Sequence, residues 1–270
     1  MLFDKLYADL VAPDGSVYVL YLAHLDFGVR LRFAEIEAYP AGAGRQVHAG
    51  RAPRNLAACL DCADALDVKL VAPAGRFRFQ ASALNGAFAP SSSAAPGVAW
   101  SVCMARTQAR LELPASLGGG CVTGVGYVDR LRVENAGIRR QLLRLDWGRV
   151  HLADSTRVWS RVTLRDGDAW QQGARWSRPG AKAEPLPAGR ASELVAAEVA
   201  GEEAAILGER VLHAGSAVDQ DRFPILPLRW LCQVLAGRPE QRRCVARLGQ
   251  SGSISGSGAG WGVYESVDFA

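Results

Sequence analysis

The sequence predicts an all-β protein, because apolar and polar residues alternate with a period of two along most of the chain. In residues 77–83, phenylalanine and alanine occupy one face of the expected strand, while arginine, glutamine and serine occupy the other. Turn signals containing glycine, proline or aspartate recur at short intervals between such stretches. Many short strands joined by regular turns are typical of a β-sandwich or a β-barrel.

The turns and connections divide the chain into short expected strands. The clearest turns fall at residues 13–15, 42–44, 73–75, 166–168 and 201–203, and longer connections rich in Ser, Gly, Ala or Pro at residues 84–97, 116–120 and 177–192. One short helix is expected near residues 227–236, since a proline stands at its start and a glycine follows its end. Its apolar stripe would be Leu228, Leu231, Val234 and Leu235.

Size and charge limit the function classes. A chain of 270 residues with 49% hydrophobic content can bury a sizeable core as a soluble globular protein. A formal net charge of +4, with arginines scattered singly, argues against a nucleic-acid partner. The longest apolar run, residues 17–23, has the length of a strand and is too short for a membrane helix, so no stable membrane insertion is expected. No signal peptide is visible at the N-terminus, and we expect a cytoplasmic protein.

The cysteines are expected to be reduced thiols used as small apolar side chains. Residues 59–62 read CLDC, but no second pair completes a zinc site and the β-rich context does not fit a thioredoxin motif. None of the four histidines has metal-ligand spacing, so no metal is expected. Serine-hydrolase, Walker and dinucleotide motifs are also missing from the sequence. The six cysteines are Cys59, Cys62, Cys103, Cys121, Cys232 and Cys244.

A weak internal repeat suggests two halves of similar length. Residues 6–22 and residues 146–162 each read as a strand, a turn containing an aspartate and a second strand. Any two β-hairpins share this outline, so a true duplication remains open. The repeat places a boundary near residue 135, which gives an N-terminal β half of residues 1–135 and a C-terminal β half of residues 136–270.

The stretch GVGYVDRL, residues 124–131, carries the strongest candidate for chemistry. In a strand, Tyr127 and Asp129 share a face that also holds Val125 and Leu131, while Arg130 points to the opposite side. A carboxyl group on such an apolar face must be paired or protonated, and a protonated one is a general acid. The glycines would allow close approach of a neighbouring strand or a ligand. The alternative is a structural aspartate that pairs with an arginine or with turn amides.

Aromatic residues and histidines supply candidate substrate-binding positions. His24 ends the most apolar expected strand, and His151 shares a strand face with Trp147. Histidines in such places can transfer a proton or orient a polar group, although a core or surface role is the common alternative. Aromatic side chains lining a β cavity suit a large apolar ligand and can stabilise a cation, with ordinary core packing as the alternative. The candidate substrate-binding residues are Trp147, His151, His24, Trp261, Tyr264 and Trp159.

Several segments together resemble a known superfamily. LFDKLYADL and GSVYVLYLA at the start, GVGYVDRL in mid-chain, LDWGRVHL after it and GWGVYESVDF at the end are similar in layout to the lipocalin-like carotenoid hydratases (hydroxyneurosporene synthases), tocopherol-cyclase-like proteins and lipocalin-like Diels–Alderases. The mid-chain motif of that superfamily has an aromatic residue, Asp and His, with Trp-Gly soon after. Tyr127, Asp129 and Trp147-Gly148 match, and Arg130 stands in the place of the His.

The resemblance implies two lipocalin-like β-barrel or β-sandwich halves packed together, with an apolar pocket near their junction. It also implies hydration, cyclisation, isomerisation or a pericyclic reaction of a terpenoid, polyene or polyketide-like substrate, without a cofactor. On this hypothesis Asp129 is the catalytic acid and Tyr127 hydrogen-bonds the acid or the substrate. The partner would be a hydrophobic small molecule, and the protein a monomer or a homodimer. The alternative function is a non-catalytic lipocalin-like carrier of a hydrophobic ligand.

Overall fold

A computed structural model describes residues 2–26, 28, 30–50, 52–53, 55–90, 97–134, 141–186, 204–216, 239–250 and 260–269. Within these residues the chain forms fifteen β-strands, one short α-helix and one 3-10 helix. The all-β class expected from the period-two alternation is confirmed. The contacts divide the chain into two compact units, Met1–Ala136 with Gly180–Lys182 and Gly137–Pro179 with Ala183–Ala270.

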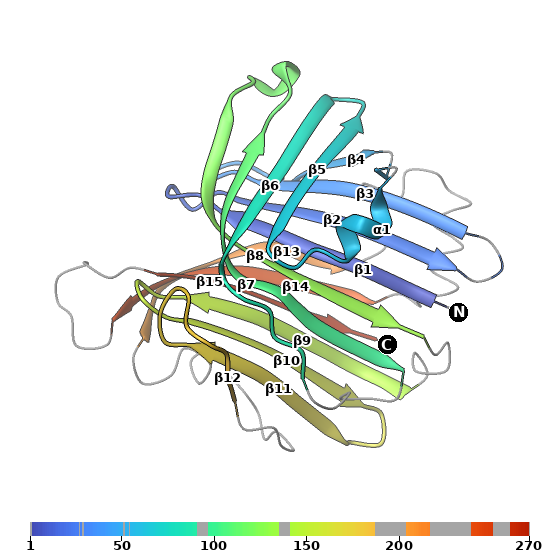
Figure 1. Cartoon of the computed structure of the whole chain (residues 1–270), viewed down its shortest axis with the longest axis vertical. Coiled ribbons are helices and arrows are strands. Elements are labelled where there is room, and N and C mark those ends of the chain that lie inside the picture. Colours follow the sequence, from blue (N-terminus) through green and yellow to red (C-terminus); the bar gives the residue numbers. More distant parts are fainter. Residues whose placement is uncertain are drawn as a thin grey trace. The chain divides into compact units, whose positions relative to one another are not determined.

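The first unit is built on an eight-stranded antiparallel sheet with the order β4-β3-β2-β1-β8-β7-β6-β5, drawn in blue to green in Figure 1. Hairpins join β1 to β4 in sequence, and the first hairpin turns at residues 12–16, where Asp14 accepts hydrogen bonds from Ser16 and Gly15 adopts a positive φ of 84°. Its strands are β1 (Leu2–Val11), β2 (Val17–Asp26), β3 (Arg30–Tyr39), β4 (Gln46–Gly50), β5 (Ala65–Ala72), β6 (Gly75–Asn85), β7 (Val98–Glu112) and β8 (Cys121–Val133).

This sheet curls into a nearly closed barrel. Its two outermost strands, β4 and β5, approach each other at Gly50, where a Cβ atom would come within 2.7 Å of Leu70 Cδ1. Side chains that point to the inside form one apolar core, with Leu6, Leu20 and Phe79 almost fully buried. We call this inward side of the sheet the barrel core face. The clean alternation of β5 and β6 in the sequence follows from having only this one face buried.

The two glycines of the mid-chain motif serve the close pairing of β8 with β1. A Cβ atom on Gly124 would overlap the carbonyl oxygen of Val11, and one on Gly126 would overlap that of Asp9. Glycine is therefore required here because a neighbouring backbone approaches closely. Of the two explanations considered for these glycines, a neighbouring strand accounts for both.

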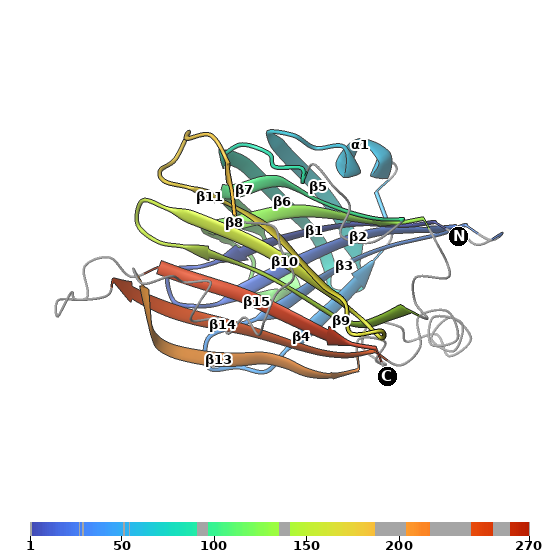
Figure 2. The same ribbon diagram turned by 90° about the horizontal axis from the view of Figure 1, so that it is seen from below.

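The second unit contains a seven-stranded antiparallel sheet with the order β12-β11-β10-β9-β15-β14-β13. Figure 2 shows β13, β14 and β15 side by side in orange and red. As in the first sheet, a meander leads outward from the first strand, and the last strand returns beside it. The weak sequence repeat thus falls on two equivalent hairpins. The strands are β9 (Leu142–His151), β10 (Thr156–Leu164), β11 (Ala169–Trp176), β12 (Glu184–Pro185), β13 (Ala204–Ser216), β14 (Glu240–Gln250) and β15 (Gly260–Asp268).

Helix is scarce, as the sequence indicates, but the helix that the structure describes is not the expected one. The helix expected near residues 227–236 lies outside the described residues. The observed helix is α1 (Leu56–Leu60), and a 3-10 turn (Ala115–Leu117) follows β7. α1 was not expected, since five residues are too few to show a helical period. Within the described ranges no helix has the length and apolar character needed to cross a membrane.

Candidate active site

The side of the first sheet that faces away from the barrel core carries an unusual set of buried polar residues. Register places Tyr7 opposite both Asp129 on β8 and Tyr21 on β2, and Asp9 opposite Tyr127. Direct partners in antiparallel strands share a face, so these side chains all point the same way. We call this set the tyrosine–carboxylate face; its members are Tyr7, Asp9, Tyr21, Glu35, Glu37, Tyr39, Tyr127 and Asp129, all of them buried.

Asp129 contributes to this face from β8 and is only 3% exposed. Its Oδ2 atom accepts two hydrogen bonds, one from the Tyr127 hydroxyl at 3.0 Å and one from the Trp100 indole N–H at 3.1 Å. Tyr127 reaches it because residues two apart in a strand share a face, and Trp100 reaches it from β7. Both donors are neutral, and Asp129 forms no ion pair with any described residue. The structural alternative in which Asp129 pairs with an arginine is therefore wrong.

Burial raises the pKa of the Asp129 carboxyl from 3.8 to about 6, because the charged form loses its hydration. The positive charge of Lys5 and the hydrogen bonds from Trp100 and Tyr127 lower this pKa, while the negative charge of Asp9 raises it. Desolvation is the largest of these effects. A carboxyl with such a pKa is protonated in a useful fraction of molecules near neutral pH, as general acid catalysis requires.

The two oxygens of Asp129 have different surroundings. Oδ2 accepts the hydrogen bonds from Tyr127 and Trp100, whereas Oδ1 accepts no hydrogen bond from the part of the chain that the structure describes. In the neutral acid, the oxygen that accepts two hydrogen bonds is best suited to be the carbonyl oxygen, and the other carries the proton. The arrangement therefore assigns the acidic proton of Asp129 to Oδ1.

Aromatic rings surround the acid on its own face. The Tyr7 and Tyr21 rings meet edge to face at 5.5 Å, and the Tyr7 and Tyr127 rings lie 6.3 Å apart. The Lys5 ammonium group stands 4.5 Å from the centre of the Tyr21 ring and 5.9 Å from that of Tyr7. These ring faces already accommodate one cation, and such rings can also stabilise a positive charge that develops in a substrate.

Two further pairs repeat the Tyr127–Asp129 arrangement on this face. The Tyr7 hydroxyl donates to Asp9 at 2.8 Å, and the Tyr39 hydroxyl donates to Glu37 at 2.7 Å. Glu37 differs from Asp129 because it also forms an ion pair with Arg45 at 2.6 Å. A tyrosine two residues from a carboxylate is thus a recurring feature of the face. A bound guanidinium distinguishes the structural carboxylate Glu37 from the candidate acid.

The expectation that Asp129 shares the apolar face of its strand is wrong. The apolar core packs against the opposite face of β8, where Val128 is fully buried, and Asp129 lies on the polar side. Alternation in the sequence could not tell the two faces apart, because valine or leucine stands on both. Asp129 is nevertheless buried, so the desolvation argument still applies to it.

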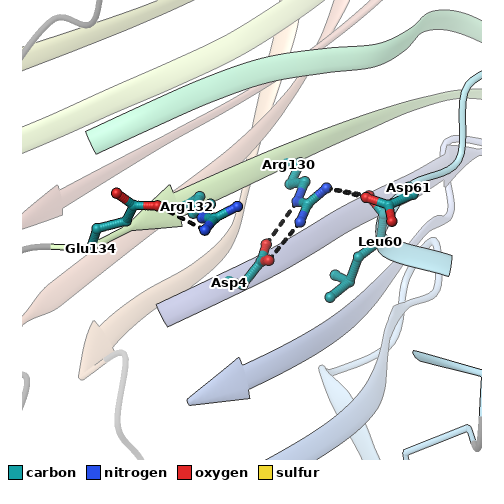
Figure 3. Close-up of polar contacts among 6 residues, drawn as sticks. All are labelled: Asp4, Leu60, Asp61, Arg130, Arg132 and Glu134. Atoms are coloured by element: carbon teal, nitrogen blue, oxygen red, sulfur yellow. Dashed lines mark hydrogen bonds and ion pairs between the residues drawn. The ribbon is translucent and has the colours of Figure 1, made fainter. Parts of the chain in front are cut away.

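Arg130 lies on the opposite side of β8 from Asp129, as alternation predicts, but this side is the barrel core face, and the guanidinium of Arg130 is bound on several sides. Its guanidinium donates to both carboxylate oxygens of Asp4 at 2.8 and 2.6 Å and to Asp61 at 2.6 Å (Figure 3). It also donates to the Leu60 carbonyl at 3.1 Å. Hydrogen bonding to Asp4 is the main reason that the pKa of Arg130 is raised above the ordinary value of an arginine. Arg130 thus links the end of α1 to β1 and β8. This role is structural, although Arg130 stands at the position where the superfamily motif has a histidine.

The predicted substrate-binding residues do not form one cluster. His24 lies opposite Asp4 in the register, on the barrel core side of β2, and so points away from the tyrosine–carboxylate face. In the second unit, Trp147 and His151 share a face of β9, as expected, and the register places Trp261 opposite His151 on that same face. Trp159 and Tyr264 lie on the other face of that sheet, in a cluster with Val150, Leu152, Ala246 and Leu248.

Gly148 explains why tryptophan is followed by glycine in the second motif. A Cβ atom on Gly148 would come within 2.6 Å of the Trp159 ring and 2.8 Å of Tyr264 Cβ. Trp159 and Tyr264 therefore pack over the backbone of β9, which is a core role. His151 is 3% exposed, and its Nδ1 lies 3.2 Å from the Thr156 hydroxyl. It shares its buried face with the ion pair of Arg243 and Glu265, whose N–O distance is 2.7 Å.

Sequence reasoning missed Trp100, Lys5 and the other tyrosine–carboxylate pairs. Trp100 lies far from Asp129 in sequence, and no local pattern reports the pairing of β7 with β8. The Tyr-x-Asp spacing of residues 7–9, which matches that of residues 127–129, was a usable signal. Among the described residues, no group of three or more His, Cys, Asp or Glu side chains is arranged to hold a metal ion.

Comparisons with known proteins agree on the fold. No family model matches the sequence, and no curated protein matches it. Among solved structures, CghA in complex with Sch210972 has a TM-score of 0.63 at 14% identity, covering 100% of this chain and 88% of CghA. Kievitone hydratase from Nectria haematococca has a TM-score of 0.52 at 11% identity, covering 98% of this chain and 88% of the hydratase. A putative AttH protein from Nitrosomonas europaea has a TM-score of 0.51 at 14% identity, covering 99% of this chain and 92% of the AttH protein.

These similarities extend over almost the whole chain and over most of each solved structure. They show that the chain has the lipocalin-like fold of these solved structures. The resemblance that the sequence motifs suggested is therefore confirmed at the level of the fold.

Proposed function

We propose that this protein is a cofactor-independent cyclase, isomerase or hydratase that acts on a hydrophobic terpenoid, polyene or polyketide-type substrate. The observation that carries the proposal is Asp129, a buried carboxyl with a pKa of about 6 whose hydrogen-bond partners are both neutral and both bound to Oδ2. The fold supports it, because one structure with this fold is by name a hydratase and another holds a small molecule, Sch210972.

Asp129 would act as the general acid through Oδ1. Its proton passes to an alkene carbon or a carbonyl oxygen of the substrate, and the electron pair of the O–H bond stays on the carboxylate. Tyr127 and Trp100 stabilise the carboxylate as it forms, since their hydrogen bonds to Oδ2 strengthen with its negative charge. The rings of Tyr7 and Tyr21 would stabilise the complementary positive charge on the substrate.

The second half of the reaction decides the product. Attack of water on the cationic carbon gives a hydrated product, whereas attack of a second double bond closes a ring. Loss of a proton from the resulting cation to the Asp129 carboxylate restores the acid and completes the cycle. The proposed roles of Trp147, His151 and Trp261 are to shape and orient the substrate; for His24, Trp159 and Tyr264 the observed faces favour packing roles instead.

The test compares wild-type protein with Asp129→Asn in an organic extract of the source cells, analysed by mass spectrometry. The wild type should consume one or more hydrophobic compounds and form products that are isobaric after cyclisation or isomerisation, or heavier by one water after hydration. Asp129→Asn should slow this conversion by about 10²–10⁴-fold, the usual contribution of a positioned acid. Conversion at the wild-type rate by the variant would remove Asp129 from the mechanism, and release of an unchanged ligand by both proteins would establish a carrier.

A further inference from the structure

Phe88, to which the proposed function assigns no role, lies on the connection that follows β6. Its backbone pairs with Val102 of β7 in an isolated antiparallel bridge. The Phe88 N–H donates to the Val102 carbonyl at 2.9 Å, and the Val102 N–H donates to the Phe88 carbonyl at 2.8 Å. The chain after β6 is therefore held against β7 at one defined residue.

This bridge brings Phe88 into line with the candidate acid. Val102 pairs with Phe88 along one edge of β7 and with Asp129 of β8 along the other. Direct partners in antiparallel strands share a face, so the side chain of Phe88 lies on the tyrosine–carboxylate face. A row of directly opposite residues thus runs across this face: Phe88, Val102, Asp129 and Tyr7.

The ring of Phe88 contacts the indole that binds the acid. Trp100 precedes Val102 by two residues in β7, so its side chain lies on the same face. The ring centroids of Phe88 and Trp100 are 6.4 Å apart, and the rings meet edge to face at 70°. Trp100 is buried and donates its N–H to Asp129 Oδ2 at 3.1 Å. The orientation of this indole decides whether Asp129 has two donors or one.

The hydrogen bond from Trp100 depends on two side-chain torsions, and rotation about either of them carries the N–H away from Oδ2. An edge-to-face aromatic pair favours one arrangement of its rings by about two- to tenfold. We propose that Phe88, itself fixed by the bridge to Val102, is a positioning residue that holds the Trp100 N–H on Asp129. The inference rests on the proposed function, in which Trp100 stabilises the carboxylate of Asp129 as it forms.

The experiment titrates wild-type protein and Phe88→Ala by NMR. It follows the ¹³C carboxyl resonance of Asp129 and the indole N–H resonance of Trp100, which is assigned with Trp100→Phe. In the wild type both should titrate with one midpoint. In Phe88→Ala the pKa of Asp129 should rise by about 0.5–1, because a weakened hydrogen bond stabilises the charged form less. An unchanged pKa would overturn the proposal. A lowered pKa would also overturn it, since the ring would then act by keeping water from the carboxyl.

Three further variants separate positioning from a general loss of stability. In the Trp100→Phe background, Phe88→Ala should cause no additional rise in the pKa of Asp129, because the donor is already gone; an additive rise would contradict the role. Phe88→Tyr keeps the ring and should retain the wild-type pKa. Phe77→Leu removes a ring from the barrel core face and should lower stability without moving this pKa. An equal rise in Phe77→Leu would show that destabilisation alone shifts the titration.

The conversion assay distinguishes failure of this inference from failure of the proposed function. Phe88→Ala should slow conversion by about two- to tenfold, far less than Asp129→Asn. If Asp129→Asn converted the substrate at the wild-type rate while Phe88→Ala still raised the pKa of Asp129, the proposed function would fail and the positioning role would stand. If Asp129→Asn slowed conversion while Phe88→Ala left both rate and pKa unchanged, the positioning role alone would fail.

Discussion

Asp129 and Arg130 are neighbours in sequence, yet the charge of Arg130 is compensated by bound carboxylates and that of Asp129 is not compensated by a bound cation. Arg130 turns toward the barrel core and meets two carboxylates and a carbonyl, so its charge is fully compensated. Asp129 turns to the other side, is more deeply buried and receives only neutral donors. One β-strand therefore carries a structural ion and a candidate acid side by side, separated by the alternation of the strand.

This difference indicates how burial leads to function in one case and to stability in the other. A buried charge that has an opposite charge beside it stays ionised and holds the structure together. A buried carboxyl with no cation bound to it, such as Asp129, has a raised pKa and keeps its proton to higher pH. Glu37, with the same tyrosine partner as Asp129 but with Arg45 bound to it, belongs to the first kind.

The largest effect on stability is expected at Arg130. Arg130→Met removes the partner of Asp4, whose side chain is only 7% exposed, and leaves that carboxylate buried without compensation. We expect a loss of about 3–5 kcal/mol in the free energy of unfolding, measured by urea denaturation. The matched control lies two residues along the same strand: Arg132 and Glu134 form an exposed pair, so Arg132→Met should cost less than about 1 kcal/mol. Equal costs for both variants would contradict the structural role of Arg130.

At Asp129 we expect a substitution to increase the free energy of unfolding at high pH, whereas the substitution of Arg130 lowers it. Its pKa is about 6 in the folded protein and 3.8 without burial, so the folded state binds the proton more tightly, and stability falls as the pH rises from about 4 to 6. Above pH 6 this costs the wild type roughly 3 kcal/mol, which the neutral Asp129→Asn does not lose. The variant should therefore be more stable than the wild type at pH 8 and lose that advantage below pH 4, by denaturant titration at both values.

Glu37→Gln provides the comparison for this stability effect. It removes one charge of a buried ion pair with Arg45, and it should destabilise the protein at pH 8. If Asp129→Asn were also destabilising at pH 8, Asp129 would be a compensated structural carboxylate like Glu37.

At Tyr127 we expect a smaller effect, on activity and on its pH dependence. Tyr127→Phe removes one of the two donors that favour the charged form of Asp129, so the pKa of this carboxyl should rise further. We expect kcat to fall by about tenfold, in keeping with a hydrogen bond to a charged group, and the pH at which activity declines to move upward. Tyr39→Phe removes the equivalent donor to Glu37 and should leave the pH profile of activity unchanged. An unshifted profile in Tyr127→Phe would disconnect Tyr127 from the acid.

The sequence predicted much of this fold, because period-two alternation and turn residues act locally. It separated Asp129 from Arg130 and placed Tyr127 beside Asp129. It could not identify the buried polar side of the sheet, since β8 has apolar residues on both faces and only the pairing with β1 decides which one meets the core. Trp100 and Lys5 were missed for the same reason, as they reach Asp129 only through pairing between strands.

The protonation of Asp129 is the central claim, and it can be measured without a substrate. The carboxyl carbon of Asp129, labelled with ¹³C and assigned by comparison with Asp129→Asn, should titrate in NMR spectra with an apparent pKa of about 6. A midpoint at or below 4 would mean that the carboxylate is ionised throughout the physiological range, and would contradict its role as the acid.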